Sequence, residues 1–370
     1  MSTFPEIKKN FGFGCMRLPM KDGEVDIAEF DRMVDAFIGA GFNYFDTAHG
    51  YIDGKSETAI KASLTSRYPR EAYILTNKLS GNHFAKEEDI RPLLDTQLEA
   101  CGVEYFDFYL MHAQNKSNFE HYKACRAYET ALELKKEGKI RHLGISFHDS
   151  AEVLDMILST YPQIEVVQIQ FNYLDFEDSG VQSRLCYEVC RKHGKPVIVM
   201  EPVKGGCLVS LPDSAAAVLD ALGGGSHASY AIRFAASFEG VEMVLSGMGN
   251  MHMMEDNLSY MKDFRPITEK ERAAIDKVVE IVHSRPLISC TDCKYCMERC
   301  PKAIPIPALF SSMNDKIRLN VWRASYRYGK ATENGGRASE CIRCGACEDA
   351  CPQKLPVRKL LAEISEEFDK

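Results

Sequence analysis

Long apolar runs are missing from this chain of 370 residues, and no segment approaches the roughly 20 apolar residues that a membrane-spanning helix needs. Runs of Lys and Arg are missing too, and the formal net charge is −8, which argues against nucleic acid as a partner. The first residues lack the apolar core of a signal peptide. We therefore expect neither a membrane nor a nucleic-acid partner, whereas a hydrophobic content of 45% is ample for a folded core.

Cysteine is abundant instead, with 14 residues, and eight of them lie in two short runs late in the chain. The first run, CTDCKYCMERCP, extends from Cys290 to Pro301, and the second, CIRCGACEDACP, extends from Cys341 to Pro352. Every cysteine of the first run, and the proline after its fourth, recurs 51 residues later. The two runs are therefore near-copies of one motif.

The spacing C-x2-C-x2-C-x3-C-P is typical of ferredoxin-type [4Fe–4S] sites, where three close thiolates hold one cube and the fourth cysteine ligates the other cube. This rule predicts two [4Fe–4S] clusters with crossed ligands. The first is assigned to Cys290, Cys293, Cys296 and Cys351, and the second to Cys341, Cys344, Cys347 and Cys300. Paired zinc ribbons are the alternative, but they separate their C-x2-C pairs by a longer arm, and a disulfide framework fits the runs less well still.

Six cysteines lie outside these runs, and we expect them to be buried apolar side chains. They are Cys15, Cys101, Cys125, Cys186, Cys190 and Cys207. Free thiols together with oxygen-sensitive clusters point to a reducing cytoplasm.

Before the cysteine runs, short β-branched or aromatic segments alternate with longer helical ones. The predicted strands are Phe11–Met16, Asn43–Asp46, Tyr73–Lys78, Phe106–His112, Ile140–Ser146, Val166–Gln170, Val197–Met200 and Met243–Ser246. The predicted helices are Ile27–Ala40, Ser56–Ser66, Asp89–Ala100, Phe119–Glu137, Ala151–Ser159, Gly180–His193, Ser226–Phe238 and Met251–Tyr260. This rhythm predicts an α/β fold, the (β/α)8 TIM barrel. The alternative, a doubly wound sheet, expects a third glycine after the first strand, which is absent.

The expected domains are the barrel at 1–266, a connecting helix within 267–285 and an α-helical, ferredoxin-type two-cluster domain at 286–370. The connecting helix is predicted at Glu269–His283 and a closing helix at Val357–Phe368. Pro307–Tyr328 is predicted as one long amphipathic helix that carries the only tryptophan, Trp322. We expect this helix to cover the clusters or to dock on the barrel.

In a (β/α)8 barrel the working residues lie where the strands end. Here Asp46, Lys78 and His112 end three successive strands, and Tyr51 follows five residues after Asp46. Asp46 can neutralise Lys78, and Lys78 is expected to lower the pKa of Tyr51 and so make it a better proton donor. The set could protonate an oxygen while hydride arrives at the neighbouring carbon.

The stretch NYFDTAHGY at 43–51, followed by GKSE at 54–57, resembles the signature of the aldo-keto reductases. Similar segments are LTNK at 75–78, YLMH at 109–112, GKIRHLGIS at 138–146, VQIQFNY at 167–173 and EDNL at 255–258. The resemblance implies a (β/α)8 barrel with NADP(H)-linked carbonyl chemistry. It also implies Tyr51 as general acid, with Asp46, Lys78 and His112 as its partners. The cysteine region is similar to an addition found in one ferredoxin-bearing branch of the superfamily.

By the same resemblance, Ser146 and Gln168 hold the nicotinamide carboxamide, and Met200 stands where an aromatic ring usually covers it. The loops after the seventh and eighth strands supply the remaining cofactor residues, which are Pro202, Lys204, Gly205, Ser246, Gly247 and Asn257. These loops could bind a phosphate of NADP(H), NAD(H) or flavin mononucleotide, although a plain tight turn would use the same glycines. The loop after Ser246 lacks the Lys and Arg that bind a 2′-phosphate, which leaves NADP against NAD open.

Three functions are compatible with both parts of the chain. The first is an oxidoreductase acting on a small carbonyl or alcohol, coupled through its clusters to a ferredoxin, a flavodoxin or another redox protein. The second is an ordinary carbonyl reductase whose clusters are structural or oxygen-sensing. The third is a non-catalytic electron-transfer or regulatory subunit, against which the complete set of groups around Tyr51 argues. We favour the first.

Overall fold

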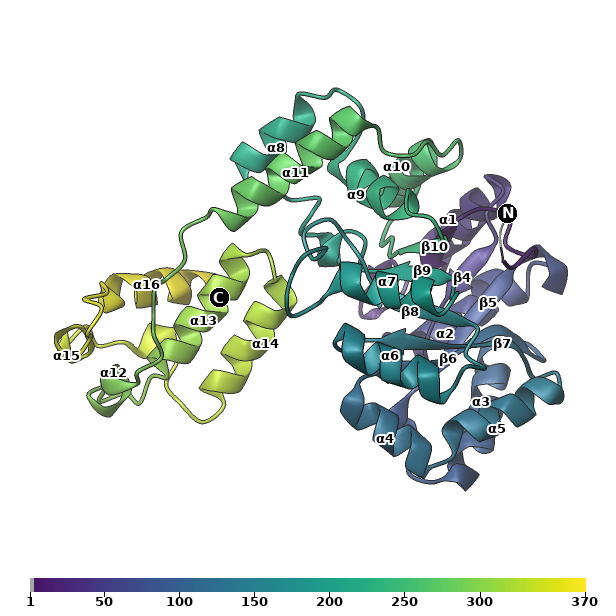
Figure 1. Ribbon diagram of the computed structural model, residues 1–370, viewed down its shortest axis with the longest axis horizontal. Helices are drawn as coiled ribbons and strands as arrows, with labels where there is room; N and C mark the ends of the chain where they lie inside the picture. The colour runs from purple at the N-terminus through teal and green to yellow at the C-terminus, as the bar shows by residue number, and fades with distance from the viewer. Residues whose placement is uncertain (1–2) are drawn as a thin grey trace. The chain divides into compact units, whose positions relative to one another are not determined.

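The computed structural model describes residues 3–370, which form two compact units (Figure 1). Of the described residues, the first unit comprises 3–203 and Gly224–Arg272, and the second comprises Lys204–Gly223 and Ala273–Lys370. Lys204–Gly223, which we expected in the barrel, thus groups with the second unit, whereas the exact domain boundaries stay a prediction. In the described part of the chain, no helix is both long and apolar enough to cross a lipid bilayer.

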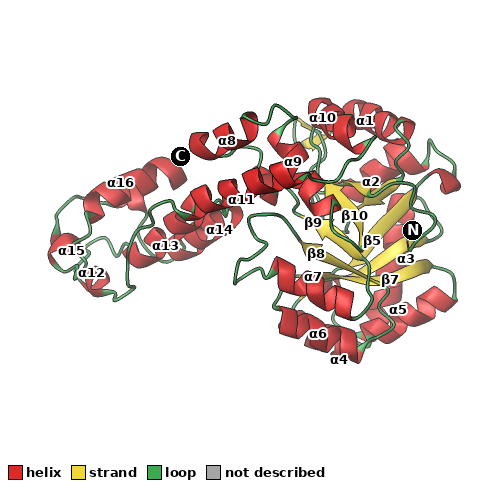
Figure 2. Ribbon diagram, turned by 45° about the horizontal axis from the view of Figure 1, so that its top comes forward, coloured by secondary structure: helices red, strands yellow, loops and turns green. Residues whose placement is uncertain are grey.

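The first unit is built on a closed barrel of eight strands, which Figure 2 shows with helices packed around it. The strands are β1 (Phe11–Gly14), β4 (Tyr44–Asp46), β5 (Ile74–Leu79), β6 (Phe106–Gln114), β7 (Ile140–Phe147), β8 (Val166–Gln170), β9 (Val197–Met200) and β10 (Val241–Ser246). All barrel pairs are parallel, and β10 closes the ring on β1. The predicted fold class is confirmed, and a barrel strand lies at each of the eight predicted positions.

Helices follow the barrel strands on the outside of the ring, and all but the last of them connect one strand to the next. They are α1 (Ile27–Gly39), α2 (Lys55–Ile60), α3 (Ile90–Cys101), α4 (Lys116–Ala124), α5 (Ala127–Lys136), α6 (Ala151–Thr160), α7 (Ser183–Lys192), α9 (His227–Ala236) and α10 (Met251–Met261). In α1, Asp26 caps the first turn by accepting a hydrogen bond from the Glu29 N–H at 3.0 Å. The buried stripe of α1, with helical spacing, is Phe30, Met33, Val34 and Phe37. A small hairpin, β2 (Met20–Lys21) and β3 (Glu24–Val25), was not predicted.

The barrel interior is packed with large side chains rather than open. Phe4, from the N-terminal segment, meets Phe108 of β6 edge to face, with ring centres 4.9 Å apart. Gly144 on β7 must lack a side chain, because a Cβ there would lie 2.5 Å from Leu110 and 2.8 Å from the backbone oxygen of Val166. A filled interior restricts chemistry to the loops at the C-terminal strand ends.

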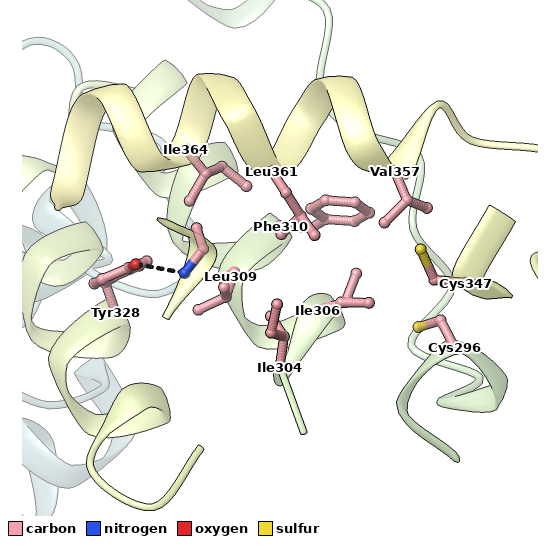
Figure 3. Close-up of a cluster of buried hydrophobic side chains, with 11 residues drawn as sticks. Cys296, Ile304, Ile306, Leu309, Phe310, Tyr328, Cys347, Val357, Leu361 and Ile364 are labelled. Atoms are coloured by element: carbon pink, nitrogen blue, oxygen red, sulfur yellow. Dashed lines mark hydrogen bonds between the residues drawn. The ribbon is translucent and has the colours of Figure 1, made fainter. Parts of the chain in front are cut away.

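The second unit is helical. Its helices are α8 (Asp213–Asp220), α11 (Glu269–His283), α12 (Tyr295–Glu298), α13 (Ile306–Ile317), α14 (Val321–Thr332), α15 (Ala346–Asp349) and α16 (Val357–Phe368), with the first residues of α11 in the first unit. Eleven buried residues form a core here, and Figure 3 shows Phe310 and Leu361 facing each other in it. Cys296 and Cys347 lie together at one end of this core, and Tyr328 lies at the other (Figure 3).

Two predicted helices are each broken in the structure. Pro307–Tyr328 was wrong as a single helix: α13 ends at Ile317, Leu319 takes a left-handed φ of 60°, and Asn320 caps α14. Phe119–Glu137 is divided into α4 and α5 in the same way, by Arg126 at a φ of 50°. Hydrophobic periodicity continues across both breaks, so it does not reveal them.

Trp322 lies on the outer face of the helix that we expected to cover the clusters or to dock on the barrel. The side chain is 76% exposed and stacks on Tyr326, also exposed, with ring centres 5.3 Å apart. The buried face of α14 consists of Ala324 and Tyr328 instead. The amphipathic character of the helix was predicted, but the tryptophan belongs to its outer face.

Candidate functional site

A buried ion pair joins the ends of β4 and β5. Lys78 is completely inaccessible to solvent, and its Nζ donates hydrogen bonds to Asp46 Oδ1 at 2.6 Å and to the backbone oxygen of Thr47 at 2.7 Å. Burial by itself lowers the pKa of Lys78, but interactions with Asp46 and Tyr51 outweigh burial and hold this pKa above its ordinary value. Lys78 therefore carries a fixed positive charge at the barrel mouth.

Tyr51 lies beside this pair, in the loop after β4. Lys78 Nζ is 4.7 Å from the centre of the Tyr51 ring. The ring centres of Tyr51 and His112 are 6.1 Å apart. Burial raises the pKa of Tyr51 and outweighs the opposing effect of Lys78, so the net shift is upward. Our expectation of a lowered pKa was wrong in net direction, because burial disfavours the phenolate more strongly than Lys78 favours it.

His112, at the C-terminal part of β6, is held by a residue that sequence reasoning missed. Its Nδ1 shares a hydrogen bond of 2.6 Å with the Ser80 hydroxyl. Burial, followed by the nearby charge of Lys78, lowers the pKa of His112 to about 3. The imidazole is therefore neutral at physiological pH. Ser80 lies two residues after Lys78, at the end of the same strand, and this position was the available signal.

Four polar residues expected to bind the cofactor are engaged in hydrogen bonds: Ser146 and Gln168, expected at the nicotinamide, and Ser246 and Asn257, expected elsewhere on the cofactor. Gln168 Nε2 donates to Asp46 Oδ2 at 3.2 Å, which ties β8 to the ion pair. Ser146 Oγ accepts from the backbone N–H of Ala113 at 2.8 Å. Ser246 Oγ accepts from Asn257 Nδ2 at 2.8 Å, which joins β10 to α10. The structure thus gives each of them a defined position at the barrel mouth.

The loop after β10 leaves its backbone open. Gly247 and Gly249 have no left-handed φ, and a Cβ added to either would lie 3.5 Å or more from its neighbours. Neither backbone conformation nor crowding within the protein therefore requires glycine at these positions. Close approach of a bound group to the backbone is the remaining physical reason for glycine here, which fits a cofactor phosphate.

Other expected cofactor residues are distributed over both units. Met200 is half-buried at the end of β9, and Pro202 is buried two residues later. Lys204 and Gly205 have left-handed φ values of 49° and 64° and begin the segment Lys204–Gly223 that groups with the second unit, so their part in cofactor binding stays a prediction. A tight turn is sufficient to explain the glycine at 205.

Two charged residues near the mouth were missed by sequence reasoning. Arg17, in the loop after β1, forms an ion pair of 3.7 Å with Glu201, in the loop after β9, and its side chain passes Gly247. Glu29 of α1 accepts a hydrogen bond from the Met251 N–H at 2.9 Å, in the first turn of α10. A carboxylate thus occupies a helix N-terminus where a phosphate would otherwise be stabilised.

In the second unit, the eight cysteines of the two runs line two cavities. We name them the first and the second cysteine cavity. The thiols of the first are those of Cys290, Cys293, Cys296 and Cys351. The thiols of the second are those of Cys300, Cys341, Cys344 and Cys347. These are the crossed sets expected from the motif, and a set of four thiols suits a [4Fe–4S] cube. In the described part of the chain, no three His, Cys, Asp or Glu side chains form a site for a single metal ion.

The fourteen cysteines are all free thiols in the structure. Five of the six outside the runs are buried, as expected, and the exception is Cys207, which is half-buried. Burial raises the pKa of Cys15, Cys186 and Cys190, so these thiols stay protonated at neutral pH.

The cysteine loops repeat in backbone conformation as well as in sequence. Asp292 and Arg343, at the same place in the two runs, have φ values of 54° and 57°. Lys294 and Gly345 follow with 67° and 86°. Left-handed conformations are rare outside glycine, so their recurrence at an offset of 51 residues shows that each run folds around its cavity in the same way.

The closed barrel with its tyrosine, lysine, aspartate and histidine at the mouth is of the aldo-keto reductase class. Residues 10–280 match the Aldo/keto reductase family, and residues 289–355 match the 4Fe-4S dicluster domain. The chain belongs to the aldo/keto reductase family and carries a C-terminal 4Fe-4S dicluster domain.

Relatives of known name support the same family. The NADH-specific methylglyoxal reductase of Escherichia coli is 28% identical over 185 residues, which are 45% of this chain and 54% of that protein. The chain thus spans about half the length of this relative. An aldo-keto reductase of Mycolicibacterium vanbaalenii is 26% identical, and the match covers 71% of this chain and 88% of that protein. The crystal structure of an aldo-keto reductase from Klebsiella pneumoniae in complex with NADPH has the same fold, with a TM-score of 0.60 and 20% identity over 73% of this chain and 90% of that one.

Proposed function

We propose that the chain is an NAD(P)H-linked oxidoreductase in which Tyr51 donates a proton to the oxygen of a small carbonyl substrate. In the reverse direction, the Tyr51 phenolate accepts the proton of an alcohol. The buried ion pair of Lys78 and Asp46 carries this proposal. A fully buried ammonium 4.7 Å from the phenol ring stabilises the phenolate that remains after proton transfer, and Asp46 keeps that ammonium charged.

His112 positions the substrate oxygen in this proposal. Its Nδ1 is taken by Ser80, so Nε2 is the ring nitrogen that faces the substrate. A neutral imidazole that accepts from Ser80 at Nδ1 carries its proton at Nε2 and donates it in a hydrogen bond to the carbonyl oxygen. Tyr51 then has an oriented oxygen to protonate.

Ser146, Gln168 and the open loop at Gly247 and Gly249 are the residues that would hold a dinucleotide. When bound, a nicotinamide supplies the hydride. We propose NAD(H) rather than NADP(H), because the loop after Ser246 offers no Lys or Arg to a 2′-phosphate, and because Glu29, which is paired with Arg32, already accepts from the Met251 N–H at the start of α10. The Escherichia coli relative is named for NADH, whereas the Klebsiella structure contains NADPH. A ratio of kcat/KM for NADPH over NADH well above one would contradict this choice, and Glu29→Gln is the variant that should raise the ratio.

The second unit, by this proposal, holds two [4Fe–4S] clusters on the crossed cysteine sets and exchanges single electrons with a ferredoxin, a flavodoxin or another redox protein. The four thiols around each cavity support it. When bound, the clusters pass electrons one at a time. Clusters that are only structural or oxygen-sensing are the second candidate. Flavin mononucleotide on the open loop at Gly247 is an alternative cofactor that would join two-electron to one-electron chemistry.

Anaerobic purification with cofactor extraction tests the proposal. We expect about eight irons and eight sulfides per chain, the content of two [4Fe–4S] clusters. NADH with substrate should then change the cluster spectrum during turnover. Clusters that stay unchanged while substrate is consumed would favour the structural or oxygen-sensing role. Extracted flavin in a ratio of about one per chain would replace the dinucleotide as the resident cofactor.

A further inference from the structure

The two cysteine cavities are lined by nearly the same set of equivalent positions, so the residues that differ between the two linings are informative. Eleven of the twelve residues that line the second cavity have a counterpart 51 residues away that lines the first. Ile304 corresponds to Leu355, for example, and Leu361 to Phe310. Ile306 lines both cavities, so the cavities are neighbours. With geometry and apolar surroundings repeated, charge is the main property in which the two cavities differ.

The largest charge difference lies within the cysteine runs. Asp292 stands between the first two cysteines of the first run, and Arg343 stands at the equivalent position of the second run. Their φ values of 54° and 57° are nearly equal, so both side chains leave the loop from the same backbone geometry. Both residues are exposed. At this one repeated position, the two cavities therefore differ by two units of charge.

The charged residues that line the two cavities do not cancel that difference. Lys302 and Arg358 line the second cavity, and Glu348 compensates Arg358 through a contact of 2.6 Å. Lys294 is the charged residue that lines the first cavity, where Gln353 replaces Lys302 and Pro307 replaces Arg358. With Arg343 included, positive charge predominates around the second cavity. With Asp292 included, the charges around the first cavity are balanced.

We propose that the cluster held by Cys300, Cys341, Cys344 and Cys347 has the higher reduction potential of the two, so that electrons entering the domain collect there. Reduction adds negative charge to a cluster that four thiolates already make negative. Nearby positive charge stabilises the reduced form, and nearby negative charge opposes it. This inference rests on the proposed pair of [4Fe–4S] clusters. It makes the domain a directed relay, in which electrons move toward the second cluster, rather than a pair of clusters with equal reduction potentials.

Redox titration of the full anaerobic chain, followed by electron paramagnetic resonance, tests the proposal. We expect two one-electron midpoint potentials, one for each cluster, separated by at least 59 mV. This separation corresponds to a tenfold preference of an electron for the second cluster over the first. Arg343→Gln should lower only the upper midpoint, and Asp292→Asn should raise only the lower one. The exchange variant, Asp292→Arg with Arg343→Asp, should narrow the separation without changing the net charge of the chain.

Two controls separate charge from structure. Lys277→Gln removes an exposed charge of α11, outside both cavity linings, and should move neither midpoint. High salt should shrink the shifts of the Asp292 and Arg343 variants, since exposed charges are screened, whereas a structural distortion would persist. Two clusters with one common midpoint, or variants that move both midpoints equally, would overturn the directed relay and leave the proposed function intact. A chain that binds no [4Fe–4S] cluster under anaerobic conditions would overturn both.

Discussion

The barrel and the second unit hold their functional residues in different ways. In the barrel, each working group has a partner within the protein: Lys78 has Asp46, and His112 has Ser80. In the second unit, the core cluster beside the cavities has eleven buried residues, and two of them are themselves cysteines of the cavities. A core that small is marginal, and bound metal commonly completes it. The barrel site is therefore preformed, whereas we expect the fold of the second unit to depend on what its cavities bind.

Cys351→Ser gives the largest expected effect and examines that dependence. Crossed ligation assigns Cys351 to the first cavity although it belongs to the second run, so this variant should lose the cluster of the first run. Iron and sulfide per chain should fall to about half, measured by elemental analysis after anaerobic purification. Cys207→Ser, outside the runs, is the matched control and should keep full iron. Loss of the cluster of the second run instead would refute the crossed assignment.

Tyr51→Phe examines the barrel in the same manner. Removal of a general acid commonly reduces kcat about 10²- to 10⁴-fold, and we expect a loss in that range for carbonyl reduction. Iron content should stay unchanged, because the ring remains and only the hydroxyl is lost. Tyr326→Phe, on the exposed face of α14, is the control and should leave kcat unchanged. An active Tyr51→Phe enzyme would remove the tyrosine from the mechanism.

Lys78→Met tests how much the buried ion pair contributes to the stability of the barrel. The variant leaves the Asp46 carboxylate buried without its partner, which should lower the free energy of unfolding of the barrel by about 3–5 kcal/mol. Denaturant unfolding followed by circular dichroism checks it. The double variant Lys78→Met with Asp46→Asn removes both charges and should recover part of the loss. Equal stability of the single and the double variant would show that the unpaired carboxylate is not the cause.

The pH profile of carbonyl reduction should be flat where a free histidine would titrate. The pKa of His112 is lowered to about 3, so the imidazole is already neutral at pH 5 and stays so at pH 8. The pKa of Tyr51 is raised above its ordinary value, so the proton-donating form is present at neutral pH and is lost only in strongly alkaline solution. A limb of kcat/KM centred near pH 6.5 would contradict this account of His112.

The smallest expected effect is a change in thermal stability when equivalent residues of the two cysteine loops are substituted. Gly345 and Lys294 share a left-handed conformation, with φ values of 86° and 67°. Gly345→Ala should destabilise the second unit by about 1 kcal/mol, because a Cβ is disfavoured in that conformation. Lys294→Gly should change stability in the opposite direction. Thermal unfolding of the iron-loaded chain checks both, and shifts of the same sign would show that the loops are not equivalent.

Much of the architecture was predictable from the sequence, and the errors have physical causes. The barrel strands were found because each is a short apolar run of regular spacing. The breaks at Arg126 and Leu319 were missed because one left-handed residue ends a helix without changing the hydrophobic pattern. Asp46, Lys78 and His112 were found because they end adjacent strands. Ser80, Arg17 and Glu29 were missed because their roles depend on contacts with residues distant in sequence.

From the sequence alone came chemical identity and repetition: three polar groups at strand ends and a loop tyrosine that can move a proton, and two cysteine runs at a constant offset. The tertiary structure decided how those groups behave. It buried Tyr51 far enough that its pKa rises despite Lys78, and it made His112 neutral. It also brought Lys302 and Arg358 to the lining of the second cavity. Burial and charge are properties of the whole enclosure, which residues from many parts of the chain create together, and no local pattern of residues specifies them.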